Sequence, residues 1–413
     1  MNKLLSLTFL AIALPLFANE QEAQLDERLN PVIEVGEDVR IDYTSYPSVH
    51  LDKNVVRLNN DDWSALARKY RSALSGDSLF TVVYLGDSHV QADFGGSVLR
   101  SRLSQNRSAG RGIIIPFRLA GTNEPRDYSF ALTSSFTASK LMRLPRTATL
   151  PFTGIGLMPK DRKFTLKISS DTPASLLRFH TCGAGVDISR VIADGEEEQF
   201  TSFSDDDGLL CLSLPRPAGE VQVSMCCEDT PVFGGVELRS DSVGVVSHSI
   251  GNNGASFSDY MHISGFGNGL SSLHPDLIVV ALGTNDAFGR QSMDSLRDNM
   301  NSLLDNIHLH NPQAKVLLVG PANCYRKVRR GSRKRRRTTQ VVNTRTTEVA
   351  RTMRLFAEEN GIPYYNQYAV AGSAESQRRA HLLSKDGVHY TATGYRLWGN
   401  LLSDAILDIL NKE

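Results

Sequence analysis

The stretch Leu79–His89, LFTVVYLGDSH, decides the fold. Its first seven residues form a continuous apolar run rich in β-branched side chains, which is typical of a strand buried on both faces of a sheet. Residues 95–104, GGSVLRSRLS, then return to a helical pattern. The stretch therefore predicts a strand, a tight turn and a helix, with Ser88 in the turn. Gly76-Asp77-Ser78 repeats the same tripeptide, but it precedes the strand instead of following it.

The same composition returns late in the chain. Short apolar runs predict further strands at 243–249, 276–282 and 315–320, with a weaker one at 361–367. Amphipathic stretches predict helices at 61–74, 292–310, 338–360 and 392–410. Strands and helices that alternate in this way imply a parallel sheet covered by helices on both faces.

Between about 117 and 240 this alternation stops. Short runs rich in Thr, Val and Ser, separated by Gly, Pro and Asp, predict an antiparallel β-sandwich inserted into the α/β domain. The predicted divisions are a signal peptide (1–18), an N-terminal lead-in (19–58), the first part of the α/β domain (59–116), the inserted β-rich domain (117–240) and the second part of the α/β domain (241–413).

The N-terminus has the features of a secretory signal. Lys3 precedes an apolar run from Leu4 to Phe17, which is too short and too quickly followed by charge for a stable membrane span. We therefore expect an exported protein of the periplasm or cell envelope, with no membrane span once the signal is removed. A buried N-terminal helix is the alternative interpretation.

The charge and cysteine content bear on three possibilities, namely nucleic-acid binding, a metal site and a disulfide scaffold. Lys plus Arg and Asp plus Glu number 45 each, so no overall charge indicates nucleic acid as a partner. The sequence has no CxxC pair or HExxH spacing, and we assign no metal. One or two disulfides could form in an oxidising compartment, although the odd number of cysteines argues against a disulfide scaffold. The five cysteines are Cys182, Cys211, Cys226, Cys227 and Cys324.

Polar segments stand where functional residues of a parallel sheet gather, at the carboxyl ends of its strands. Residues 86–89, 251–255 and 283–286 each follow a predicted strand, and 386–389 lie before the last helix. Similar segments at 121–123 and 305–308 follow no buried strand or lie inside a helix, so we set them aside.

These segments contain the groups that acyl transfer needs. A serine is a poor nucleophile until a histidine takes its proton and a carboxylate orients that histidine, which predicts Ser88, His389 and Asp386 as the catalytic residues. The oxyanion requires preorganised donors. The candidates are the N–H groups of Ser88 and Gly254 and the side-chain amide of Asn285.

In these residues the sequence resembles the SGNH hydrolases, also called GDSL lipases or esterases. Ser88, Gly254, Asn285 and His389 match the four signature blocks in order, and Asp386 stands at the usual DxxH spacing. The resemblance covers about two-thirds of the chain. It implies a flavodoxin-like three-layer fold, a Ser-His-Asp triad, an oxyanion hole completed by Gly and Asn, and no cofactor.

A narrower resemblance is to the bacterial peptidoglycan O-acetylesterases. It rests on GDSHVQAD (86–93), the β-rich insertion and GVVSHSIGNNGASFSDY (244–260). It implies removal of acetyl groups from O6 of N-acetylmuramic acid by way of an acetyl-enzyme, and an insertion that resembles a carbohydrate-binding module. The expected partner is therefore O-acetylated peptidoglycan or another acetylated glycan, with His89 and Asn253 as candidate substrate contacts.

Other functions remain open at this stage. An SGNH-type O-acetyltransferase would use the same residues, with a sugar hydroxyl in place of water. A non-catalytic glycan-binding protein is the alternative from another class, and a lipase for long acyl chains is a third. The run 326–337 holds nine cations in twelve residues and is expected to be a solvated loop, with attraction to an anionic glycan as the functional alternative. The sequence gives no expectation for the oligomeric state.

Overall fold

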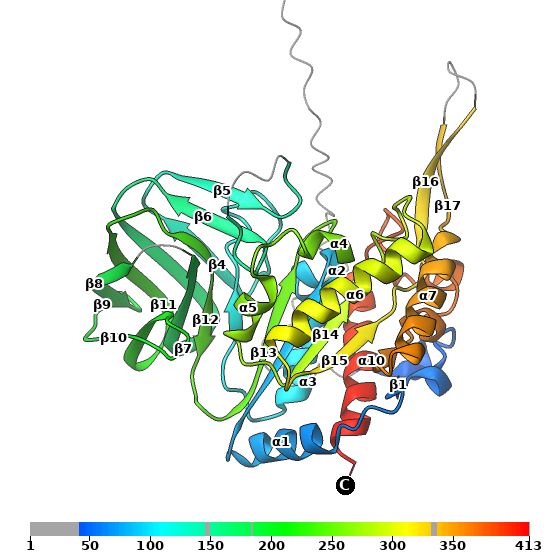
Figure 1. The fold of residues 1–413 in the computed structure, drawn as a ribbon, viewed down its shortest axis with the longest axis horizontal. Helices are drawn as coiled ribbons and strands as arrows, with labels where there is room; N and C mark the ends of the chain where they lie inside the picture. The colour runs from blue at the N-terminus through cyan, green and yellow to red at the C-terminus, as the bar shows by residue number, and fades with distance from the viewer. Residues whose placement is uncertain (1–40, 145–148, 183–184, 332–336, 413) are drawn as a thin grey trace, which may run out of the picture.

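The computed structural model describes residues 41–144, 149–182, 185–331 and 337–412. The predicted signal peptide and much of the lead-in lie outside the described residues. Within them, no helix is both long and apolar enough to span a membrane. Two bodies lie side by side, an α/β domain and an antiparallel β domain (Figure 1).

The α/β domain is built on a six-stranded sheet. Its strands, in spatial order, are β1 (Val56–Arg57), β18 (Tyr364–Tyr365), β15 (Lys315–Val319), β14 (Leu277–Ala281), β2 (Leu79–Gly86) and β13 (Gly244–Gly251). All neighbouring pairs are parallel except β1 and β18. The apolar run of residues 79–85 therefore lies in a central strand, β2, which explains why it is hydrophobic on both faces.

Helices cover both faces of this sheet. On one face, Val82 and Val279 pack in one cluster with side chains of α1 (Ser64–Ser75), α3 (Phe94–Ser104) and α10 (Ala392–Leu410). On the other, Val83 and Val280 pack with α6 (Met293–His310) and α7 (Arg345–Glu359). The predicted three-layer α/β fold is confirmed. The shorter helices are η2 (Tyr43–Ser45), η3 (Leu51–Lys53), α2 (Ser88–Gln91), α4 (Phe257–Tyr260), α5 (Phe266–Ser271), α8 (Gln367–Val370) and α9 (Ala374–Arg379).

Among the residues that the structure describes, the predicted antiparallel insertion is present as one hydrogen-bonded network of ten strands. They are β3 (Gly112–Ile114), β4 (Tyr128–Leu132), β5 (Phe136–Lys140), β6 (Ile155–Pro159), β7 (Lys163–Cys182), β8 (Val186–Ala193), β9 (Glu196–Glu197), β10 (Thr201–Ser204), β11 (Leu210–Cys227) and β12 (Val232–Arg239). Pairing of β7 with β11 shifts register around Ala218. Before that shift β7 pairs with β4, and after it with β12, so two long strands serve both halves of the sheet.

The antiparallel sheet starts earlier than the sequence indicates. Strand β3 pairs with β12 although it precedes residue 117. Because β3 also lies against β13 of the parallel sheet, it connects the two domains. Short strands of this kind carry too few residues for a period to be recognised.

Two predictions in the second half of the chain were wrong. The basic run 326–337 was expected to be a loop, and residues 338–360 were expected to be one helix; residues 332–336 of the basic run lie outside the described residues. Instead β16 (Tyr325–Arg330) and β17 (Arg337–Val342) form an antiparallel hairpin that projects from the body, and α7 begins only at Arg345 (Figure 1). Residues 338–342, TTQVV, are mostly β-branched and fit a strand.

All five cysteines lie in the described part of the chain, and all are free thiols. The possible disulfides among them are therefore not formed in this structure.

Candidate active site

Ser88 is placed by the turn between β2 and α2. Asp87 caps the short helix, because its Oδ1 accepts the His89 N–H at 2.9 Å. A Cβ on Gly86 would lie 2.6 Å from the carbonyl oxygen of Ala281, so only glycine fits at this position. The turn thus presents Ser88, half-buried, at the carboxyl edge of the sheet.

Ser88, His389 and Asp386 form one hydrogen-bonded chain. Ser88 Oγ lies 2.9 Å from His389 Nε2, and His389 Nδ1 lies 2.6 Å from Asp386 Oδ2. The other oxygen, Asp386 Oδ1, accepts the backbone N–H groups of Val388 and His389 and the hydroxyl of Ser384. The carboxylate is thereby held in one orientation, and the imidazole is held with it.

The electrostatics of this pair favour a basic histidine. Burial alone would raise the pKa of Asp386, but the hydrogen bond and charge of His389 outweigh it and lower that pKa well below its ordinary value. Burial acts to lower the pKa of His389, but the hydrogen bond to Asp386 and its charge raise that pKa above 6.5. Such an imidazole can take a proton from Ser88.

The three predicted oxyanion donors belong to three loops, which follow β2, β13 and β14. Gly254 has φ +83°, a left-handed conformation that favours glycine, in the turn after β13. No hydrogen bond runs from the N–H of Ser88 or of Gly254 to another described residue. Asn285 Nδ2 donates to Asp87 Oδ2 at 3.1 Å and to the Ala255 carbonyl at 2.9 Å. Both amide hydrogens are engaged, so Asn285 can serve an oxyanion only by releasing one of these acceptors.

Asp87 is a buried carboxyl group that accepts hydrogen bonds from two loops of the site. Its side chain is fully buried, and burial raises its pKa to about 7. One oxygen caps the turn at His89 and the other accepts from Asn285. The carboxyl group therefore links the nucleophile turn to the loop of Asn285.

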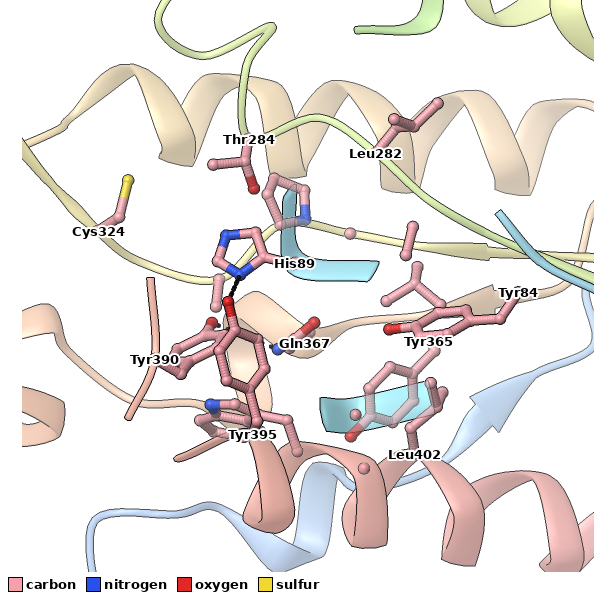
Figure 2. Close-up of a pocket in the computed structure, with 18 of the residues that line it drawn as sticks. Tyr84, His89, Leu282, Thr284, Cys324, Tyr365, Gln367, Tyr390, Tyr395 and Leu402 are labelled. Atoms are coloured by element: carbon pink, nitrogen blue, oxygen red, sulfur yellow. Dashed lines mark hydrogen bonds between the residues drawn. The ribbon is translucent and has the colours of Figure 1, made fainter. Parts of the chain in front are cut away.

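His89 lies between the triad and a small cavity. Its ring centroid is 5.4 Å from that of His389, and its Nδ1 lies 3.2 Å from the hydroxyl of Tyr395 (Figure 2). Burial lowers the pKa of His89 to about 3, so the ring is neutral. The cavity has a volume of about 50 Å³, room for a few water molecules. Its wall includes Tyr84, Tyr365 and Tyr390.

Asn253, the second predicted substrate contact, is exposed beside Gly254. Its Nδ2 donates to Thr122 Oγ1 at 3.1 Å and to Asn123. Its backbone N–H donates to Gln91 Oε1 at 2.8 Å, and Gln91 Nε2 donates to the Asn123 carbonyl at 2.8 Å. The loop of Gly254 is therefore fastened to helix α2 and to the segment that enters the β domain.

The part played by Gln91, Thr122 and Asn123 was not predicted from the sequence. Residues 121–123 were set aside because no buried strand precedes them. The structure brings them to Asn253 through tertiary contacts that no local pattern signals. Within the described residues, no group of three or more His, Cys, Asp or Glu side chains could hold a metal ion.

Residues 237–397 match the model of the GDSL-like Lipase/Acylhydrolase family. This segment of the chain is therefore similar to the GDSL-like hydrolases. The predicted family resemblance is thereby confirmed, and so is the enzyme class, a carboxylic ester hydrolase. The matched segment of the GDSL-like domain contains Gly254, Asn285, Asp386 and His389, while Ser88 lies before it, beyond the β domain.

Solved structures give a likeness in fold. A structure entitled "Peptidoglycan O-acetylesterase in action, 5 min" covers 87% of this chain and 98% of its own, with 20% identity and a TM-score of 0.67. A lipase/acylhydrolase from Enterococcus faecalis covers 40% of this chain and 76% of its own, with 20% identity and a TM-score of 0.29. A catalytic mutant of an acetylxylan esterase from Geobacillus stearothermophilus covers 42% and 75%, with 16% identity and a TM-score of 0.29. No curated protein matches the chain.

The structure entitled "Peptidoglycan O-acetylesterase in action, 5 min" shares the fold of both parts of this chain, the α/β domain and the β domain. A coverage of 87% exceeds the α/β portion of the chain, so the aligned region must include strands of the insertion.

Proposed function

We propose that this protein is an exported serine esterase that removes O-acetyl groups from a cell-wall glycan, with O6-acetylated N-acetylmuramic acid of peptidoglycan as its substrate. The hydrogen-bonded chain of Ser88, His389 and Asp386 carries the proposal. The likeness in fold to a peptidoglycan O-acetylesterase over 87% of the chain supports the choice of substrate. The N-terminal signal predicted from the sequence supports a location where that glycan is found.

In the first half of the reaction, Ser88 Oγ attacks the acetyl carbonyl carbon while His389 Nε2 takes the hydroxyl proton. Asp386 holds the imidazolium that forms. The negative charge that develops on the carbonyl oxygen is stabilised by the N–H groups of Ser88 and Gly254, and by the amide of Asn285 once it has released one of its two acceptors. The intermediate then collapses, the bond to the sugar oxygen breaks, and His389 gives its proton to that oxygen.

In the second half, water attacks the acetyl group on Ser88. His389 takes one proton of that water and returns it to Ser88 Oγ as the acyl bond breaks, which releases acetate and restores the free serine. Every proton passes through His389, so these residues need no cofactor for this chemistry. A sugar hydroxyl in place of the water would make the protein an acetyltransferase.

The test is acetate release from O-acetylated peptidoglycan by the mature protein, with acetylated xylan and a long-chain ester as comparison substrates. Ser88→Ala is expected to abolish release. Ser78→Ala is the matched control, because Ser78 stands in the other Gly-Asp-Ser tripeptide, before β2, where its hydroxyl donates to the Lys69 carbonyl at 3.4 Å.

Three outcomes would contradict parts of the proposal. Faster hydrolysis of the acetylated xylan or the long-chain ester than of O-acetylated peptidoglycan would contradict the proposed substrate. Full activity of Ser88→Ala would overturn the mechanism. Transfer of acetyl to an added acceptor glycan in preference to water would make the protein a transferase.

A further inference from the structure

The described strands of the β16–β17 hairpin carry a cluster of exposed cations. Whereas the chain as a whole has equal numbers of cations and anions, the described strands expose Arg326, Lys327, Arg329, Arg330 and Arg337. No described carboxylate forms an ion pair with any of the four arginines. An arm of this kind attracts polyanions, and the attraction weakens as salt rises.

The base of the hairpin is fastened to the loop that holds the catalytic pair. The Tyr325 N–H donates to the Gly387 carbonyl at 2.7 Å. Gln340 Nε2 donates to the carbonyls of Lys385 and Asp386 at 2.9 and 2.8 Å. Arg378 stacks on the ring of Tyr325 with 3.5 Å from its guanidinium carbon to the ring centroid, and also donates to Gln340.

The two faces of the hairpin are not equivalent. Side chains of a strand alternate between faces, and directly paired residues share one. Lys327 pairs with Gln340, so Lys327 and Arg329 continue outward on the face whose base contacts the Asp386 loop. One step of two residues is about 7 Å, which places Arg329 one such step beyond Gln340. Arg326 and Arg330 lie on the opposite face.

We propose that this catalytic-side face, defined by Lys327 and Arg329, is a docking surface for the acidic polymer that bears the ester, a glycan with carboxylate side groups. The proposal rests on the esterase function proposed above and adds that the enzyme selects its polymer by charge next to the acetyl group. Arginine suits this role, because its fork of donors matches a carboxylate with two parallel hydrogen bonds.

Two observations favour a polymer over a membrane surface. Cations occur on both faces of the hairpin, whereas a segment that lies on a bilayer has one charged and one apolar face. The described hairpin also exposes no large apolar side chain; Val328, Val341 and Val342 are only partly accessible. A thin arm charged on both faces fits along a chain and not flat on a plane.

The experiment compares two double variants of equal charge. Lys327→Gln/Arg329→Gln removes two cations from the catalytic-side face, and Arg326→Gln/Arg330→Gln removes two from the opposite face. Binding to O-acetylated peptidoglycan sacculi is measured by co-sedimentation, in a Ser88→Ala background that prevents turnover. Hydrolysis is measured with the Ser88 enzymes on sacculi and on 4-nitrophenyl acetate, a small uncharged ester.

The catalytic-side variant is expected to raise KM on sacculi roughly 3- to 10-fold at low salt, with kcat and small-ester hydrolysis unchanged. The opposite-face variant should change KM much less, and the difference should disappear at about 1 M salt, where screening is nearly complete. If both double variants lost the same affinity for sacculi, the hairpin would act by its general charge and not through a defined docking face. Wild-type binding by the catalytic-side variant would overturn the proposal.

Two further arms separate the possible failures. Vesicles of phosphatidylglycerol test the membrane, and stronger salt-sensitive binding to them than to sacculi would overturn the glycan as occupant. If the wild-type protein hydrolyses 4-nitrophenyl acetate but the hairpin variants behave like it on sacculi, only the docking surface is wrong. If the wild type hydrolyses no acetyl ester, the proposed function itself fails.

Discussion

Ser88 and His389 stand 301 positions apart in the chain, yet Ser88 Oγ lies 2.9 Å from His389 Nε2. The parallel sheet accounts for this, because each strand delivers its following loop to the same edge. The β domain is inserted between the two residues without disturbing that edge. Since the pair depends on the Asp386 carboxylate for its orientation, pH and the Asp386 side chain should control activity together.

Activity is expected to fall as pH drops through the pKa of His389. The pKa of this group is raised above 6.5, and only the neutral imidazole can act as a base, so kcat/KM should plateau above that pKa and decline below it. Asp386→Asn removes the partner that raises the pKa. The acid limb of the profile should therefore move to lower pH, while the plateau falls by about 10³- to 10⁴-fold.

Asp305→Asn is the matched control for that change. Asp305 and His308 repeat the DxxH spacing on the exposed face of helix α6. The control should leave both the plateau and the position of the acid limb as in the wild type. An acid limb that stays in place in Asp386→Asn would show that another group controls it.

Removal of the Asn285 amide is expected to lower kcat strongly. Asn285→Ala removes one oxyanion donor, for which a loss of about 10²- to 10³-fold in kcat is typical. The same loss should appear on 4-nitrophenyl acetate and on the polymer, because the oxyanion forms on both. The thermal stability of the variant should be measured beside its kinetics, because Asp87 also loses a hydrogen-bond donor in Asn285→Ala. A change confined to KM would rule out the role in the oxyanion hole.

Local patterns in the sequence were enough to predict the parallel sheet and the positions of Ser88, Gly254, Asn285 and His389. Each of the first three follows an apolar strand, and strand character is encoded within a few residues. The association of Gln91 with Thr122 could not be predicted this way, because it depends on how an inserted domain returns to the sheet. The hairpin was missed since a run of cations hides the alternation that marks a strand.

Gln91 is expected to act as a positioning residue for the Gly254 loop. It is buried, and its Oε1 accepts the N–H of Asn253. Gln91→Leu leaves this N–H and the Asn123 carbonyl without their Gln91 partner, at a cost of about 1–3 kcal/mol for a buried group. We expect kcat to fall about tenfold on both substrates.

Gln91→Glu separates the two halves of this contact. Glutamate keeps an oxygen that can accept from Asn253 but loses the donor to Asn123. Recovery of kcat in Gln91→Glu would assign the effect to the Gly254 loop. A loss of stability in Gln91→Leu with unchanged kcat would show that the role is structural only.

Mild acid should destabilise the fold through two histidines at the junction of the domains. His248 is fully buried, and its Nδ1 accepts the Ile113 N–H at 3.0 Å, which requires a neutral ring. Burial and nearby cations, Arg178 and Arg239 among them, lower its pKa well below 6.5, although Glu237 lies 3.9 Å from its Nε2. Burial likewise lowers the pKa of His180 to about 3.

The direction of the effect follows from proton binding. The unfolded chain takes up protons on these histidines below pH 6.5, whereas the folded chain does so only at much lower pH. The stability that these two histidines contribute is therefore complete above pH 6.5 and falls as pH decreases, by at most about 1.4 kcal/mol per pH unit for each histidine. Asp87, whose pKa burial raises to about 7, contributes in the opposite direction over this range, because the folded chain binds its proton before the unfolded chain does. Urea unfolding between pH 7.5 and 5 measures this slope. His248→Gln, which can still accept from Ile113, should reduce the slope by the share of one histidine, and an unchanged slope would show that His248 is not one of the groups responsible.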